Sequence, residues 1–192
     1  MKLAPIILFV YNRKDHTERL IRSLLANKLA NESELIIYSD GAKTEQEAPL
    51  VEEVRTYIQT IQGFQKVSIV EQKQNKGLAQ SVIDGVSQVI NTYGKVIVLE
   101  DDLVLAPYFL SFMNEALDKY ETEHRVGHIQ GCDFTNSTEL PYTFLIKWTG
   151  SWGWATWKRA WDYFNPKGDE LLSELKRKKL NKRFDFGGAY PF

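Results

Sequence analysis

The stretch VIVLEDDL, residues 96–103, predicts both the fold and the functional site of this 192-residue chain. It begins with an unbroken run of Val, Ile and Leu, which is typical of a strand buried on both faces in a parallel sheet. Glu100, Asp101 and Asp102 follow directly. Carboxylates at a rigid strand end offer the oxygen ligands that Mn²⁺ and Mg²⁺ prefer. The alternative is a solvated turn in which Asp102 caps the next helix.

Similar apolar runs rich in β-branched residues predict four strands, at residues 5–11, 34–39, 66–71 and 95–99. Segments with apolar residues at helical spacing separate these runs. Such alternation of strands and helices implies right-handed crossovers between parallel strands. The sequence therefore predicts an α/β fold with a mostly parallel central sheet that helices flank on both faces.

The first predicted helix begins at a cap supplied by Asp15 or Thr17. Two further helices span residues 47–61 and 77–93, and the second of them stops before Gly94. Their apolar faces carry the residues that we expect to be buried: Leu20, Ile21, Leu24, Leu25, Leu50, Val51, Val54, Ile58, Ile61, Val82, Ile83, Val86, Val89 and Ile90.

The pattern becomes less regular after residue 99. A helix is predicted over residues 107–120, and strands of a mixed region over residues 126–132 and 141–148. Two further helical stretches follow, at residues 156–163 and 169–182.

Polar residues follow each predicted strand, and the carboxyl ends of parallel strands form the edge where open α/β sheets bind ligands. Tyr11 and Arg13 offer a stacking face and a cation after the first strand. Asp40, whose carboxylate only accepts hydrogen bonds, suits the imide N–H of a uracil. Lys76 and Gly77 lie at a helix N-terminus that favours anions, and Gly77 allows close approach of the backbone. Surface or capping roles for Arg13, Asp40 and Lys76 stay open.

Composition and motifs exclude several other classes of protein. The loop after the first strand has no glycine, so neither a dinucleotide-binding turn nor a phosphate-binding P-loop is present. A formal net charge of -1 gives no overall footprint for nucleic acid. The single cysteine, Cys132, cannot form an internal disulfide, so we expect a cytoplasmic protein. No stretch approaches the ~20 apolar residues of a membrane span.

Taken together, these residues resemble the GT-A glycosyltransferases, in particular family 2 and the Golgi N-acetylglucosaminyltransferases that act on mannose-rich N-glycans. The resemblance implies that the α/β sheet is of the GT-A type. It also implies one domain, with a nucleotide-binding half at residues 1–103 and a mixed acceptor-side half at residues 104–192. The segments that carry the resemblance are residues 6–13, 36–41, 75–80, 96–103 and the Trp-rich stretch WTGSWGWATWKRAW at 148–161.

By this resemblance, Asp102 binds Mn²⁺ (or Mg²⁺), Asp101 lies near the ribose of the donor, and Glu100 belongs to the donor site. Asp40 again reads the uracil. The implied reaction is transfer of a sugar, such as GlcNAc, from a UDP-sugar to a glycan or glycolipid acceptor. Two alternatives stay open: a nucleotidyltransferase, and a non-catalytic nucleotide- or carbohydrate-binding module on the same fold.

The resemblance further implies inversion, which needs a carboxylate base to deprotonate the acceptor hydroxyl. Asp185 is the nearest equivalent, and Asp162 and Asp133 stay open. The chain ends in an aromatic and glycine-rich run, residues 184–192, whereas similar transferases continue past this point. We therefore expect the acceptor-side half to be truncated at its C-terminus.

The Trp-rich stretch contains all five tryptophans of the chain. Aromatic faces suit the C–H faces of pyranose rings, so we expect Trp152 or Trp154 to contact a sugar. Trp157 and Trp161 are expected in the core. A basic run at residues 176–179 predicts a solvated helix face, with contact to an anionic membrane surface as the alternative.

Overall fold

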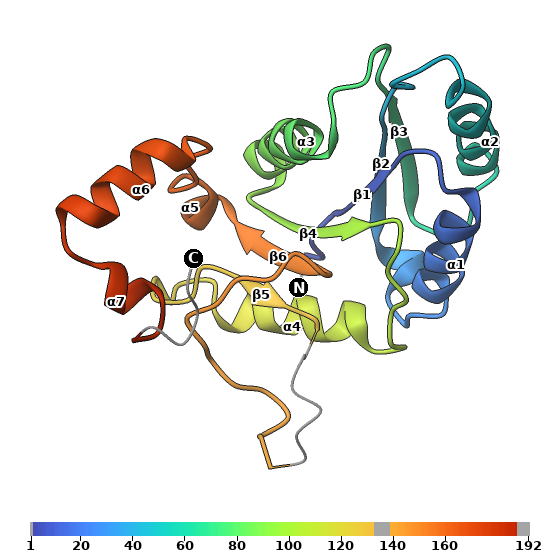
Figure 1. Cartoon of the computed structure of the whole chain (residues 1–192). Helices are drawn as coiled ribbons and strands as arrows, with labels where there is room; N and C mark the ends of the chain where they lie inside the picture. Colours follow the sequence, from blue (N-terminus) through green and yellow to red (C-terminus); the bar gives the residue numbers. More distant parts are fainter. Residues whose placement is uncertain (1, 133–138, 188–192) are drawn as a thin grey trace. The chain divides into compact units, whose positions relative to one another are not determined.

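The computed structural model describes residues 2–132 and 139–187 (Figure 1). The chain divides into two compact units, Met1–Trp161 and Asp162–Phe192. The predicted single domain, with its halves meeting after residue 103, stays a prediction. Within the described residues, no helix is both long and apolar enough to span a membrane.

The first unit is built on one mixed sheet, whose strand order over the described residues is β3-β2-β1-β4-β6-β5. The pairs β1–β2, β1–β4 and β2–β3 are parallel, and β6 is antiparallel to both β4 and β5. This confirms the predicted parallel strands. The strands are β1 (Ile6–Val10), β2 (Glu34–Ser39), β3 (Lys66–Glu71), β4 (Lys95–Glu100), β5 (Ile129–Gln130) and β6 (Trp154–Trp157).

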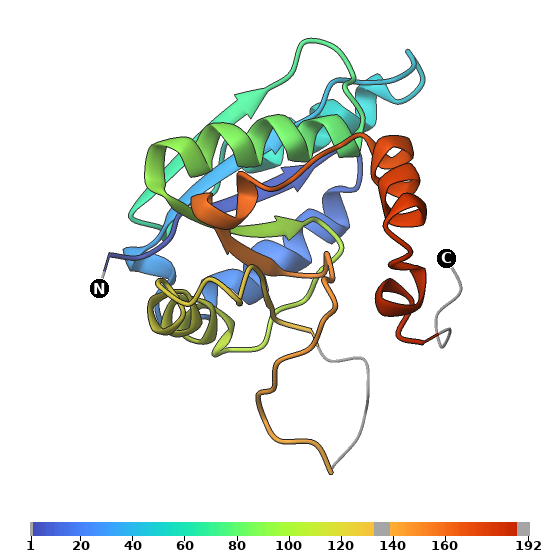
Figure 2. The same ribbon diagram turned by 90° about the vertical axis from the view of Figure 1, so that its left-hand side faces the viewer.

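Helices cover both faces of this sheet because side chains alternate along each strand. Figure 1 and Figure 2 show α3 on one face of the sheet and α1, α2 and α4 on the other. Ile6 and Leu8 of β1 pack into the cluster with α1, α2 and α4, whereas Ile7 and Phe9 pack against α3. Every residue of β1 is buried. The helices are α1 (Lys14–Leu25), α2 (Ala48–Ile58), α3 (Leu78–Tyr93), α4 (Phe109–Lys119) and the short η1 (Ala30–Glu32) and α5 (Lys158–Trp161).

Several predicted helix boundaries shift. Helix α1 begins at Lys14, and its cap position is Arg13, which makes no side-chain capping bond. The predicted caps were therefore wrong; the hydroxyl of Thr17 instead donates to the Arg13 carbonyl at 3.1 Å, inside the first turn. Leu25 and Leu50 are exposed rather than buried. Helix α3 ends as predicted, because Gly94 adopts the left-handed conformation (φ 81°) that stops a helix.

The strand predicted over residues 141–148 is wrong, and the Trp-rich stretch supplies a strand instead. Residues 141–148 lie outside any helix or strand, and their apolar side chains are largely exposed. Strand β6 pairs with β4, with Trp154 opposite Val98, because Trp-Ala-Thr-Trp is rich in strand-forming residues that bury two indole rings. The predicted strand at 126–132 shortens to β5, and the helix at 156–163 to α5.

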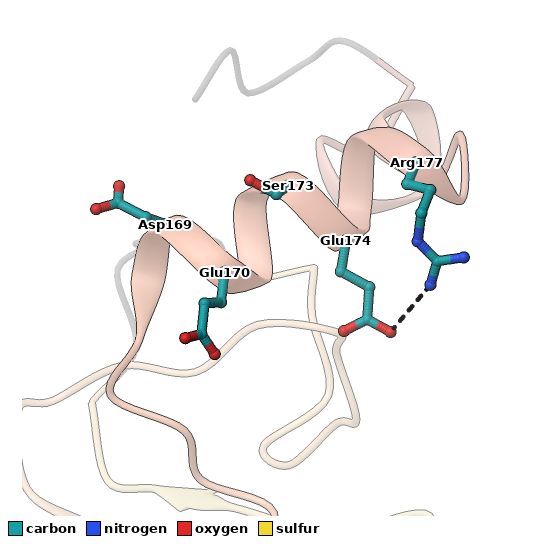
Figure 3. Close-up of a pocket in the computed structure, with 5 residues that line it drawn as sticks. All are labelled: Asp169, Glu170, Ser173, Glu174 and Arg177. Carbon is teal, nitrogen blue, oxygen red and sulfur yellow. Dashed lines mark ion pairs between the residues drawn. The ribbon is translucent and has the colours of Figure 1, made fainter.

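The second unit contains α6 (Gly168–Arg177) and α7 (Asn181–Phe184). The predicted helix over residues 169–182 is thus interrupted, at a point where Lys179 has a φ of 57°. Figure 3 shows the charged side chains along α6, where Glu174 and Arg177 approach to 3.8 Å. Exposed ion pairs of this kind contribute little to stability.

We expect substitution of the central strand to be the most damaging change to the fold. Leu8→Ala removes a side chain with 0% exposure from the packed layer between β1 and the helices, and should lower the free energy of unfolding by about 2–5 kcal/mol. The control Leu78→Ala, at a position 57% exposed, should change it by less than about 0.5 kcal/mol. Urea unfolding followed by tryptophan fluorescence measures both; equal losses would contradict the assigned core.

Candidate functional site

The carboxyl ends of the parallel strands meet at one edge of the sheet. Val10 pairs with Ser39, Ser39 with Glu71, and Phe9 with Glu100, so the strands end at nearly the same level. Strand β5 runs in the same direction as β4, because both are antiparallel to β6. The residues that follow β1, β2, β3 and β4 therefore lie along the edge where such sheets bind ligands.

The acidic end of β4 is joined to the end of β1 through Arg13. The Arg13 guanidinium forms an ion pair with Asp101, through Nη2 on one carboxylate oxygen and Nε on the other, and Nη2 lies 3.4 Å from Asp102 Oδ2. Asp101 is only 4% exposed. The structure thus brings together three of the predicted site residues, with Arg13 bonded to the acidic residues themselves.

Burial and mutual repulsion perturb the carboxyl groups at this end of the sheet. Desolvation raises the pKa of Asp101, and the hydrogen bond and charge of Arg13 oppose that rise. Glu100 is partly buried; its pKa is raised by desolvation and then by the charges of Asp102 and Asp101. The end of β4 thus places three adjacent acidic residues beside one guanidinium, so an additional cation would stabilise it.

The residues fit an open metal site better than a closed one. Among residues 2–132 and 139–187, no three His, Cys, Asp or Glu side chains are grouped so that they could enclose a metal ion. The Asp102 side chain is 44% exposed and can offer an oxygen to an incoming ion. Hard divalent ions often take one or two protein carboxylates and complete their shell with phosphate oxygens and water. Asp102 suits this arrangement.

Asp40, which follows β2, accepts hydrogen bonds from two neighbouring loops. Its Oδ1 accepts from the backbone N–H of Gly41 at 2.8 Å and of Lys76 at 2.9 Å. Its Oδ2 accepts from the N–H of Gly77 at 2.9 Å and from Asn75 Nδ2 at 3.2 Å. These bonds occupy the lone pairs of a side chain that is 8% exposed. The predicted contact of Asp40 with uracil stays a prediction, and in this structure both carboxylate oxygens already accept hydrogen bonds from the chain.

The remaining residues predicted on the nucleotide side also have partners in the structure. Lys76 Nζ lies 2.8 Å from Asp84, and this hydrogen bond is the largest cause of the lowered pKa of Asp84. Gly77 precedes α3 with a φ of 77°, which a side chain would disfavour. Tyr11 Oη accepts from the Lys43 N–H at 2.9 Å. The loops after β2 and β3 are thus held in place by their own hydrogen bonds.

Arg55 of α2 is the residue at this edge that sequence reasoning missed. Its side chain is 20% exposed, and it contacts the carboxyl ends of both β2 and β3. Sequence alone indicates this role only weakly, because Arg55 is simply a basic residue next to the buried Val54 in the helix that follows Asp40.

The Trp-rich stretch divides into core and surface. Trp154 is 9% exposed and stacks on His128 and Trp161, with ring centroids 5.3 and 6.0 Å apart, so the predicted sugar contact does not fit this ring. Trp152 is 55% exposed and precedes β6 at the same edge. Trp157 is buried as predicted, with its indole N–H donating to the Leu117 carbonyl at 3.0 Å.

The candidate bases lie apart from these residues in the chain. Asp185 directly follows α7, and Asp162 begins the second unit. Asp133 lies outside the described residues. The identity of the base stays a prediction.

The raised pKa of Glu100 predicts a pH-dependent gain in stability for Glu100→Gln. Because the folded pKa lies above the unfolded value of about 4.3, the ionised group destabilises the fold above that pH, and the penalty disappears once both states are protonated. Urea unfolding should therefore find Glu100→Gln more stable than wild type at pH 7 and equal to it below about pH 4.

The exposed Glu115→Gln serves as the matched control, and should stay within about 0.5 kcal/mol of wild type at neutral pH. A Glu100→Gln protein less stable than wild type at pH 7 would contradict the assigned environment.

Comparisons with known proteins were made by sequence and by structure. The sequence model of Glycosyl transferase family 2 matches residues 6–176. A search of curated proteins finds no match. Among solved structures, the mannosyltransferase PcManGT from Pyrobaculum calidifontis, in complex with GDP-Man and Mn²⁺, is 19% identical with a TM-score of 0.48, over 65% of this chain and 34% of that chain.

Two further solved structures are similar at a comparable level. TarS from S. aureus is 19% identical with a TM-score of 0.44, over 63% of this chain and 20% of that chain. A putative nucleotide-diphospho-sugar transferase from Desulfovibrio desulfuricans G20 is 12% identical with a TM-score of 0.45, over 93% of this chain and 78% of that chain. The chain thus spans about a third of the mannosyltransferase and a fifth of TarS.

The family assignment rests on the sequence model, which covers most of the chain. It confirms the predicted resemblance at the level of the family; the finer likeness to the Golgi enzymes stays a prediction. The chain belongs to glycosyl transferase family 2, and its α/β sheet is of the GT-A type.

Proposed function

We propose that this chain forms the donor-binding part of a metal-dependent glycosyltransferase that moves a sugar from a UDP-sugar to a glycan or glycolipid acceptor. The observation that carries the proposal is the arrangement of three adjacent acidic residues and one arginine at the end of β4. There Asp102 is half-exposed beside the Arg13–Asp101 ion pair. A divalent cation would supply the positive charge that this point lacks, and could also bind the diphosphate of the donor.

Each residue of the acidic end has a distinct task in this proposal. Asp102 would hold the Mn²⁺ or Mg²⁺ ion together with the phosphate oxygens of the donor. Asp101 is buried and keeps Arg13 in place, close to the predicted ribose. Arg13, which is 46% exposed, can contact a diphosphate without leaving Asp101. The bound ion supplies positive charge that stabilises the leaving nucleoside diphosphate.

The acceptor side of the proposal rests on fewer contacts. Trp152 is the exposed ring that could stack on a sugar at the same edge. We propose an inverting reaction with Asp185 as the base, and GlcNAc as one donor sugar. We also propose a cytoplasmic location, with the basic end of α6 supporting peripheral contact with an anionic membrane.

The metal dependence is tested by Asp102→Asn. Loss of this carboxylate should weaken UDP binding in the presence of Mn²⁺ by at least about tenfold, because the ion then bridges fewer anionic groups. Isothermal calorimetry with UDP, with and without Mn²⁺, measures the effect. The exposed Asp118→Asn in α4 is the control and should bind UDP like the wild type. Unchanged affinity in Asp102→Asn would refute the metal site.

The donor base is tested on the wild type. A thermal-shift series with UDP, GDP and UDP-sugars, each with Mn²⁺, should give the largest stabilisation with UDP compounds, since a ligand that binds only the folded state raises its stability. Preference for GDP would overturn the UDP assignment. Binding without transfer of a radiolabelled sugar to any acceptor would favour the non-catalytic module.

A further inference from the structure

Arg55 links α2 to the carboxyl ends of β2 and β3, which are neighbours in the sheet. Its Nη2 donates to the Gln72 carbonyl at 2.8 Å and to the Asp40 carbonyl at 3.4 Å, and Nε donates to Ser39 Oγ at 3.3 Å. A mostly buried guanidinium needs such acceptors, because it always carries its charge and its N–H groups. One side chain thereby fixes the ends of β2 and β3 to each other.

Asp40 transmits this arrangement to the loop at residues 72–77. Its backbone is held by Arg55, and its carboxylate accepts from the N–H groups of Lys76 and Gly77. The two segments also touch closely at Gly41, where an added Cβ would lie 2.6 Å from the Gln74 carbonyl carbon. The start of α3 is therefore positioned by a chain of contacts that begins at Arg55.

We propose that Arg55 is a positioning residue for the donor nucleotide, which sets the 72–77 loop through the backbone and carboxylate of Asp40. The proposal rests on the proposed function. In the described part of the chain, the polar contacts of Arg55 fall on the β2 and β3 ends. Strand β1 separates these ends from β4 and Asp102. Arg55 thus affects nucleotide affinity without affecting binding of the metal alone.

The planar shape of the Arg55 guanidinium, as well as its charge, allows it to hold the ends of β2 and β3 together. A planar fork can satisfy acceptors on two separate segments at once, whereas a lysine ammonium is a single point of contact. The ion pair of Arg55 with Glu71, at 3.8 Å and on a side chain 40% exposed, contributes little by comparison. This difference supplies a matched control, Glu71→Gln, which leaves the bonds to the two carbonyls intact.

The experiment compares wild type with Arg55→Gln, Arg55→Lys and Glu71→Gln. With saturating Mn²⁺, Arg55→Gln should weaken UDP binding by about tenfold, because the 72–77 loop is then less well positioned, and Arg55→Lys should weaken it less. Glu71→Gln should bind like the wild type. Binding of Mn²⁺ alone, followed by electron paramagnetic resonance, should be equal in all four proteins. Amide hydrogen exchange at Lys76 and Gly77 should be faster in Arg55→Gln.

Several outcomes would overturn the positioning role. Wild-type affinity for UDP in Arg55→Gln would do so, and so would an equal loss of UDP and Mn²⁺ binding, which indicates general damage. If Arg55→Gln does not fold, Arg55→Lys is judged by the same criteria. A wild type that binds no UDP would instead refute the proposed function; faster exchange at Lys76 and Gly77 would then still support control of the loop, and unchanged exchange would refute it.

Discussion

Burying a carboxylate costs free energy unless donors or cations surround it, and this constraint shapes the carboxyl edge of the sheet. Asp40 and Asp101 each directly follow a strand of the buried parallel core, and both are less than 10% exposed. Neither could occupy its position without partners brought from elsewhere in the chain. Arg13, which follows β1, pairs with Asp101. The N–H groups of Lys76 and Gly77, between β3 and α3, donate to Asp40.

The two carboxylates are satisfied in different ways, and the difference separates scaffold from binding site. Asp40 accepts hydrogen bonds from three backbone N–H groups, so its carboxylate is satisfied within the chain and holds the surrounding loops together. Asp101 has one arginine, shared with Asp102, and a pKa that remains raised by burial. The hydrogen bonds to Asp40 fix the shape of the loops around it. The acidic end of β4 has less positive charge nearby and therefore attracts a cation.

The sequence predicted the parallel sheet well because strands buried on both faces leave an unbroken apolar signal, as in β1 and β4. It misplaced the last strand because exposed apolar residues at 141–148 look the same in sequence as buried ones. The three adjacent acidic residues Glu100, Asp101 and Asp102 sufficed to predict the acidic end of β4. The hydrogen bonds of Asp40 come from residues more than thirty positions away. Those of Arg55 go to carbonyl groups in two other segments. No local sequence pattern indicates such long-range contacts.

The pairing of β5 with β6 has a consequence for how this part of the molecule can vary. Gln130 lies opposite Trp154, and the Gly131 N–H donates to the Gly153 carbonyl at 2.8 Å, so the chain leaves the sheet and re-enters it at one point. The entropic cost of closing such a loop rises only slowly with its length. Insertions, deletions or wholesale exchange between these two glycines would therefore leave the ladder intact. The β5–β6 pairing therefore tolerates changes in the length of the chain that joins the two strands.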